Sequence, residues 1–120
     1  MTDQTSDDLD SLRETLRAFT QDRDWDQFHS PKNLAMALAG EVGEVCEHFQ
    51  WLDGEQSCNL DENTRDAVAL ELADVLIYLV RLADKLDVDL VAAAHRKMEI
   101  NAEKYPADQV RGSSRKYNRY

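Results

Sequence analysis

Two strongly apolar stretches of this chain each carry a pair of acids spaced three residues apart. The stretches read LAMALAGEVGEVCEHF and AVALELADVLIYLVRLA, and the pairs are Glu41-x-x-Glu44 and Glu71-x-x-Asp74. Residues three apart share one face of an α-helix, so each pair directs two carboxylates the same way. Because an unpaired buried carboxylate is very costly, these acids require a neutralising group. The pattern favours two packed helices with a divalent cation bound by oxygen ligands.

Apolar side chains recur at helical spacing along most of the chain, without strand-like alternation. Start signals support the helices, since Ser6 precedes two acids and Ser30 caps a helix whose first residue is Pro31. The third helix is apolar on nearly all sides, so we predict that it is central and buried. The expected helices cover residues 6–23, 31–49, 63–86 and 89–104, with a loop at 51–63. The predicted fold is all-α, a four-helix bundle-like subunit of a size that often assembles as an oligomer.

The overall charge excludes some classes of partner. With 120 residues and a formal net charge of −10, the chain would be repelled by the phosphate backbones of nucleic acids. No apolar run approaches the length of a membrane span, and the acidic, polar N-terminus does not resemble a signal peptide. We therefore expect no nucleic-acid partner, no membrane partner and a cytoplasmic location.

The end of the chain differs in charge from the rest. We assign residues 1–106 to a single domain and residues 107–120 to a basic C-terminal tail. A solvated tail is one interpretation, and a basic arm that holds phosphates or a neighbouring subunit is the other. Against the single acid Asp108, the tail carries Arg111, Arg115, Lys116 and Arg119.

The four acids offer only oxygen ligands, which suit Mg²⁺ with Mn²⁺ as a substitute. Di-iron centres built on helices need Glu-x-x-His repeats, and this sequence contains none. Because Mg²⁺ is usually shared between carboxylates and substrate phosphates, we predict a polyphosphate substrate and metal-activated water. Aromatic rings to stack on a base are Trp25, Phe28, Trp51 and Tyr78, although Phe28 and Trp51 suit a core or interface role equally well. Donors to phosphate or sugar are Lys97, Asn101 and Lys104.

Three other interpretations of the acids stay open. In the first, they are ordinary surface charges, although the third helix has little solvated face. In the second, the chain is an assembly partner whose buried acids pair with Arg65, Arg81 or Lys97. In the third, the chain is a helical oligomer that binds metal and nucleotide without hydrolysing the nucleotide.

The acid pairs stand in a longer context that resembles a known family. The matching segments are WDQFHSPKNLAMALAGEVGEVCEHFQW, ELADVLIYLVRLADKLDVDL and KMEINAEKYP, and the similarity covers about residues 8–106. They resemble the all-α nucleoside triphosphate pyrophosphohydrolases, which include the MazG-like proteins, and within them the dCTP pyrophosphatase branch. The resemblance implies Mg²⁺-dependent cleavage between the α- and β-phosphates, giving a nucleoside monophosphate and pyrophosphate. It also implies house-cleaning of the nucleotide pool, dCTP or a related or modified dNTP as substrate, and a homotetramer built from two dimers.

The same resemblance implies roles for individual residues. It assigns the metal to Glu41, Glu44, Glu71 and Asp74. It assigns the base to the segment Trp25, Asp26, Gln27, Phe28 and His29, with Trp51 and Tyr78 completing the pocket. A C-terminal motif for substrate contact maps onto Lys97, Asn101, Lys104 and Tyr105. The candidates for the general base are Glu44 and Glu47. The segment 53–63 and the Arg-rich tail depart from the family, which leaves the preferred base open.

Overall fold

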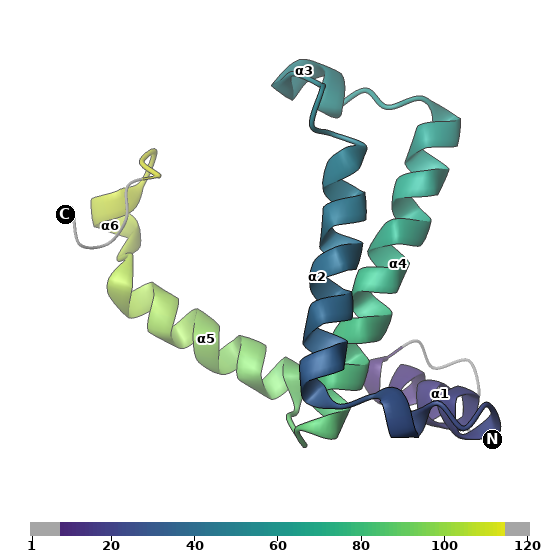
Figure 1. Ribbon diagram of the computed structural model, residues 1–120. Helices are drawn as coiled ribbons and strands as arrows, with labels where there is room; N and C mark the ends of the chain where they lie inside the picture. The colour runs from purple at the N-terminus through teal and green to yellow at the C-terminus, as the bar shows by residue number, and fades with distance from the viewer. Residues whose placement is uncertain (1–7, 115–120) are drawn as a thin grey trace, which may run out of the picture. The chain divides into compact units, whose positions relative to one another are not determined.

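The computed structural model describes residues 8–114, and these residues form helices without any strand. The all-α fold predicted from the sequence is thus confirmed, and four long helices match the four expected ones (Figure 1). Two four-residue helices and a short 3₁₀ helix were not expected. In chain order the elements are α1 (Leu9–Asp22), the 3₁₀ helix η1 (Asp26–Phe28), α2 (Pro31–Glu47), α3 (Gly54–Ser57), α4 (Glu62–Lys85), α5 (Leu90–Lys104) and α6 (Ala107–Val110).

The chain divides into two compact units, one ending at Asp87 and the other beginning at Val88. The first contains α1 to α4, and the second contains α5 and α6. The assignment of residues 1–106 to one domain stays a prediction, and Arg115, Lys116 and Arg119 of the tail lie outside the described residues. Within residues 8–114 no helix has the length and apolar character required to cross a membrane.

Side-chain caps fix where the helices of the first unit begin. The Oγ atom of Ser30 accepts a hydrogen bond from the backbone N–H of Asn33 at 3.1 Å, and Pro31 occupies the first helical position, as predicted. Asp8 caps α1, while the expected start at Ser6 lies outside the described residues. The predicted loop at 51–63 contains α3, because Asp53 forms a capping box with Gln56 that stabilises one helical turn.

Within the first unit, α2 and α4 lie side by side in opposite directions, and α1 packs against the C-terminal part of α4 (Figure 1). Most of the buried side chains gather at this end of the unit. Leu34 in the first turn of α2 is only 1% exposed. The other buried apolar residues are Leu16, Val68, Val80 and Ala83, and the buried polar residues are Thr20 and Arg81. The α1–α2–α4 junction is therefore the core of this unit.

The prediction that the third helix is buried on nearly all sides is wrong for the isolated chain. On α4, Leu70 is 71% exposed and Leu72 is 52% exposed, and Leu76 and Leu79 are also exposed. The other helices of the unit cover only part of this 24-residue helix. Hydrophobic periodicity shows which faces of a helix avoid water, but it does not show whether the same chain covers them. An exposed apolar face of this kind is typical of an interaction surface.

Candidate functional site

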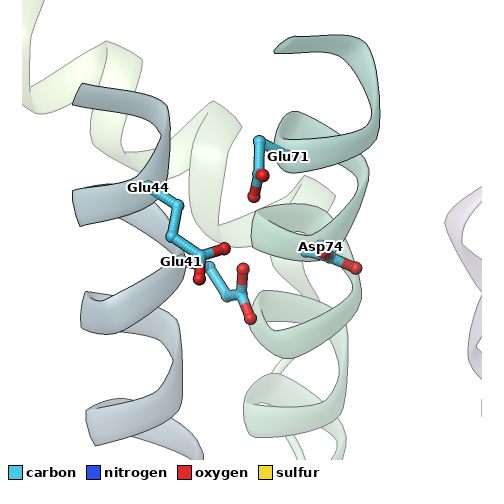
Figure 2. Close-up of side chains that lie close together, drawn as sticks. All are labelled: Glu41, Glu44, Glu71 and Asp74. Carbon is cyan, nitrogen blue, oxygen red and sulfur yellow. The ribbon is translucent and has the colours of Figure 1, made fainter. Parts of the chain in front are cut away.

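The two acid pairs meet between α2 and α4. Glu41 and Glu44 extend from α2 toward α4, which carries Glu71 and Asp74 (Figure 2). One ligand atom from each of the four residues lies within 4.8 Å of the other three. The antiparallel packing of the two helices brings the pairs together, and the spacing of three residues places both members of a pair on the facing side. The four-acid cluster expected from the sequence is therefore present in the fold.

The electrostatics of this four-acid cluster are unfavourable for the charged state. A hydrogen bond with Glu44, partial burial and the charges of Glu44, Asp74 and Glu71 raise the pKa of Glu41 to about 7. The hydrogen bond with Glu44, burial and the neighbouring acids also raise the pKa of Glu71. Carboxylates this close together cannot all ionise cheaply, so they share protons or bind a cation.

Two oxygen atoms indicate that the four-acid cluster fits a cation. The Oε2 atoms of Glu41 and Glu71 are buried, and neither has a hydrogen-bond partner. A buried acceptor without a partner is costly and calls for an explanation, such as an ion. The donor set consists of carboxylate oxygens alone, which matches the preference of hard divalent cations. These residues therefore suit a divalent metal ion.

The interpretation in which basic side chains neutralise the acids is not supported for the arginines. Among residues 8–87, no arginine or lysine forms an ion pair with Glu41, Glu44, Glu71 or Asp74. Arg81 pairs with Asp26 and Asp84 instead. The surface-charge interpretation is also wrong for Glu41 and Glu71, whose Oε2 atoms are buried.

Glu47, one of the two candidates for the general base, lies outside the four-acid cluster. It is the last residue of α2, one turn beyond Glu44, and its side chain is exposed. It lines an open cavity of about 610 Å³ between the end of α2, α3 and the start of α4. Of the two candidates, only Glu44 contacts the other acids.

The aromatic residues predicted to form one base pocket lie at two ends of α2. Trp25 precedes η1 and packs edge-on against Phe19, with ring centroids 5.8 Å apart. Trp51 follows α2 and is 86% exposed. The 17 residues of α2 separate these positions by about 25 Å at 1.5 Å per residue. Within one chain, then, the structure does not bring Trp51 to the Trp25–His29 segment.

Tyr78 and the C-terminal residues occupy other positions. Tyr78 is half-buried on α4, one turn after Asp74. Spacings of four and three residues place Lys97, Asn101 and Lys104 on one face of α5. Tyr105 follows that helix, and its backbone N–H donates to the carbonyl of Asn101 at 2.8 Å. These four residues belong to the second unit, so their contact with substrate stays a prediction.

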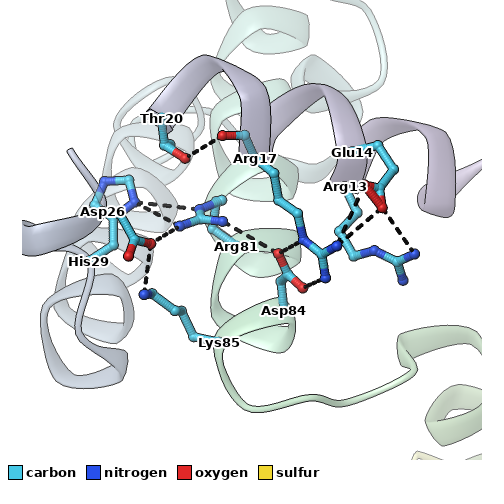
Figure 3. Close-up of polar contacts among 9 residues, drawn as sticks. All are labelled: Arg13, Glu14, Arg17, Thr20, Asp26, His29, Arg81, Asp84 and Lys85. Atoms are coloured by element: carbon cyan, nitrogen blue, oxygen red, sulfur yellow. Dashed lines mark hydrogen bonds and ion pairs between the residues drawn. The ribbon is translucent and has the colours of Figure 1, made fainter. Parts of the chain in front are cut away.

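Sequence reasoning missed a second charged cluster, at the α1–α2–α4 junction (Figure 3). Its centre is Arg81, whose side chain is only 5% exposed. The Arg81 guanidinium lies 3.1 Å from Asp26, 3.4 Å from Asp84 and 3.4 Å from Nδ1 of His29. Lys85 also pairs with Asp26 at 2.7 Å, and Arg17 pairs with Asp84. The sequence contains a signal for this cluster, since Arg81 interrupts the apolar run LIYLVRLA just as the acid pairs interrupt their apolar stretches.

The pKa values of this Arg81 cluster shift in the opposite direction from those of the four-acid cluster. The hydrogen bond and charge of Lys85, with a further contribution from Arg81, lower the pKa of Asp26. Arg17 lowers the pKa of Asp84 in the same way. Burial and the positive charge of Arg81 lower the pKa of His29, which favours its neutral form. Every charge in the cluster therefore has an opposite charge within reach.

The helix pair and its four-acid cluster define a class of all-α proteins, and comparison with known proteins identifies the family. The sequence pattern of the MazG-like family matches residues 36–119. A crystal structure of a pyrophosphatase from Archaeoglobus fulgidus superimposes with a TM-score of 0.78 at 40% identity, covering 82% of this chain and 92% of that one. The chain therefore belongs to the MazG-like family, as its motifs predicted.

Mammalian relatives match closely over most of the chain. Human dCTP pyrophosphatase 1 is 50% identical over 111 residues, which make up 91% of this chain and 65% of the human protein. The rat protein of the same name is 47% identical over 113 residues, again 91% of this chain and 65% of the relative. This chain thus spans slightly less than two thirds of the length of these relatives.

Proposed function

We propose that this chain is a Mg²⁺-dependent nucleoside triphosphate pyrophosphohydrolase. It cleaves between the α- and β-phosphates of dCTP or a related or modified dNTP, and it releases the monophosphate and pyrophosphate. The observation that carries this proposal is the four-acid cluster with its two partnerless buried oxygens, in a chain 50% identical to human dCTP pyrophosphatase 1. The expected role is removal of unwanted nucleotides from the cytoplasmic pool.

In this proposal the metal ion is bound by Glu41, Glu44, Glu71 and Asp74. When bound there, Mg²⁺ offsets the crowded negative charge and polarises the phosphate oxygens of the substrate. The oxygen-only donor set favours Mg²⁺, with Mn²⁺ as a substitute. A proton held by Glu41, whose pKa is raised to about 7, leaves when the metal enters.

Glu44 is the stronger of the two candidates for the general base. It lies within the four-acid cluster, where its carboxylate is close to Glu41 and Glu71 and raises the pKa of both. A base must lie within hydrogen-bond reach of the water that attacks the phosphate. Glu47 lines a separate cavity and is suited to that role only through an intervening group.

The nucleotide base is assigned to the Trp25–His29 segment, and Tyr78 lies one turn of α4 from Asp74. Trp51 lies about 25 Å from that segment along α2, so one nucleotide does not reach both within a single chain. A pocket that uses both requires a second copy, and the exposed leucines of α4 offer an apolar surface for it. This supports sites shared between copies of the chain, and the family resemblance extends the proposal to a homotetramer of two dimers. Neither nucleic acid nor membrane is an expected partner.

The test is turnover of a panel of nucleoside triphosphates by the purified chain with Mg²⁺, followed by chromatography of the products. We expect dCTP to give dCMP and pyrophosphate. Release of orthophosphate and a nucleoside diphosphate would contradict the proposed bond. Tight, Mg²⁺-dependent binding of dCTP without turnover would favour the non-catalytic helical oligomer instead.

A further inference from the structure

We propose that Arg81 is a positioning residue that anchors the Trp25–His29 segment to α4 and presents His29 to the nucleotide as its Nε2–H tautomer. This inference rests on the proposed function, because the segment is assigned there to the nucleotide base. It concerns a side chain that touches neither the four acids nor, in this proposal, the substrate. Arg81 acts through the two residues that it holds, Asp26 and His29.

Apart from its contacts with Arg81 and Lys85, the segment is held by interactions with residues near it in the sequence. η1 is a single 3₁₀ turn of three residues, in which the N–H of Phe28 donates to the carbonyl of Trp25 and that of His29 donates to Asp26. Short 3₁₀ turns have poor hydrogen-bond geometry and rarely persist alone. Trp25 and Phe28 are both exposed, so burial of their rings contributes little. Contacts with α1 and α2 add to the turn, since the N–H of Trp25 donates to Thr20, its ring packs on Phe19, and the Asn33 amide donates to the carbonyl of Phe28. None of these contacts ties the segment to α4, the helix that carries Glu71 and Asp74.

Arg81 supplies that connection from inside the core. Its guanidinium contacts Asp26 at 3.1 Å and His29 at 3.4 Å, which lie 55 and 52 residues earlier in the sequence. Arginine's planar fork of donors holds several acceptors in fixed directions, which a single ammonium group cannot do. Lys85, one turn further along α4, adds a second ion pair to Asp26 at 2.7 Å. Both ends of η1 are thus tied to the helix that carries Glu71 and Asp74.

The guanidinium is itself held in place. Asp84 accepts a hydrogen bond from Arg81 at 3.4 Å and two from Arg17, at 2.8 Å and 2.5 Å (Figure 3). Asp84 therefore joins α1 to α4 and fixes one edge of the Arg81 fork. With its side chain only 5% exposed, Arg81 has no solvated alternative position. The segment and the acid-bearing helix consequently behave as one rigid piece.

The contact with Arg81 also decides which nitrogen of His29 carries the proton. A guanidinium has donors and no acceptor, so Nδ1 of His29 must accept from it. The proton of the neutral ring therefore lies on Nε2, and that nitrogen is presented as a donor. The charged groups that face the ring are Arg81, Lys85 and Asp26, and burial together with Arg81 lowers the pKa of His29. A neutral donor suits the carbonyl oxygens and ring nitrogens of a pyrimidine base.

Nitrogen NMR of the imidazole rings tests the tautomer without any turnover. The full chain has three histidines, and the signals of His29 are identified by their loss in His29→Gln. In the wild type at pH 7.5 we expect an unprotonated Nδ1 and a protonated Nε2. In Arg81→Met we expect a mixture of tautomers and a higher pKa for His29. A wild-type ring protonated at Nδ1 would overturn the proposal, whether or not the chain hydrolyses dCTP.

Steady-state kinetics with dCTP and Mg²⁺ test the positioning role. Arg81→Met should raise KM about tenfold or more while kcat changes less than about threefold, and Arg81→Lys should recover part of the loss. Arg96→Met, at an exposed arginine of α5, is the matched control and should leave both constants unchanged. A fall in kcat with unchanged KM would contradict a role in holding the base. If Arg81→Met does not fold, Arg81→Lys tests the positioning role in its place. Wild-type values of KM and kcat in Arg81→Lys would show that the guanidinium group is not required, which would overturn the proposal.

Discussion

The helix α4 contributes residues to two charged clusters that differ in how their charges are balanced. Near its middle, Glu71 and Asp74 face two further acids, and no arginine or lysine among residues 8–87 pairs with them. Near its C-terminal end, Arg81 and Lys85 pair with Asp26 and Asp84. Acid neighbours raise the pKa of Glu71, whereas cationic neighbours lower the pKa of Asp84.

This difference separates charged residues that stabilise the fold from charged residues that are suited to bind a ligand. A buried charged network whose members all have partners holds helices together and needs nothing from outside. A cluster of like charges with partnerless oxygens is unfavourable until a counter-ion arrives, so it is a candidate functional site. The two clusters on α4 therefore predict opposite responses to substitution, metal and pH.

The largest expected effect is on turnover at the four-acid cluster. Glu41→Gln or Asp74→Asn should lower kcat/KM for dCTP about 1,000-fold, because each removes a charge from the proposed metal site. Circular dichroism should show an unchanged helical content, since these acids do not stabilise the metal-free fold. Near-wild-type rates in either variant would remove that residue from the site.

The next effect is on stability at the Arg81 cluster. Asp84→Ala should lower the free energy of unfolding by about 3 kcal/mol, because it leaves the buried guanidinium of Arg81 short of a counter-charge. Urea denaturation measures this loss. Asp66→Ala, at an exposed position on the same helix, is the control and should change stability by less than about 0.5 kcal/mol. Equal losses in both variants would show that the cluster is not structural.

Metal should stabilise the protein through the four-acid cluster alone. At 100 times its dissociation constant, Mg²⁺ should add about 2.7 kcal/mol to the free energy of unfolding, seen as a higher Tm. Glu71→Gln should abolish this increase, whereas Lys85→Met should keep it. Calorimetry in buffers of different ionisation enthalpy should show proton release at pH 7, because the pKa of Glu41 is about 7. Stabilisation that persists in Glu71→Gln would place the metal elsewhere.

The pH dependence of stability should separate the two clusters by sign. The folded pKa of Glu41 is raised from 4.5 to about 7, so the metal-free fold should gain stability as pH falls from 7 toward 4.5. The folded pKa of Asp84 is lowered from 3.8, so its contribution is present above pH 3.8 and is lost as pH falls further. Glu41→Gln should weaken the first dependence, to which the raised pKa of Glu71 also contributes, and should leave the second unchanged in urea titrations across this range. Because the lowered pKa of His29 opposes this gain as pH falls, the test is the difference between the two curves. Identical curves for the wild type and Glu41→Gln from pH 7 to 4.5 would contradict the raised pKa of Glu41.

The smallest change in the free energy of unfolding is expected at an exposed ion pair, which serves as a reference for the buried Arg81 cluster. Arg96 and Glu99 lie 3.4 Å apart on α5, with side chains 73% and 70% exposed. Arg96→Ala should change the free energy of unfolding by less than about 0.5 kcal/mol, because such pairs gain little in water. A larger loss by denaturation would indicate that this surface is covered in the assembled protein.

Local patterns predicted the four-acid cluster, because its information lies within single helices. The spacing of Glu41 and Glu44, repeated in Glu71 and Asp74, defines a face without reference to the rest of the chain. The helix starts at Ser30 and Pro31 were predictable for the same reason. Fold class, helix positions and the convergence of the acids follow from such local rules.

Contacts between distant segments were not predictable in this way. The ion pair of Arg81 with Asp26 joins positions 55 residues apart, and no periodic pattern encodes such a partner. Likewise, the predicted pocket joined Trp25 to Trp51, although the length of α2 separates them. The burial expected for Leu70 and Leu72 is absent, because the apolar pattern of a helix does not reveal which chain covers it.

The exposed leucines of α4 have a consequence for the protein at low concentration. Copies that cover such a face through each other separate on dilution, so the helices lose their shared cover before the chain itself unfolds. We therefore expect the specific activity to fall as the protein is diluted and to return on concentration. Under the proposed function, a cell that makes few copies would then hydrolyse little nucleotide, and hydrolysis would begin only above a threshold concentration of the protein.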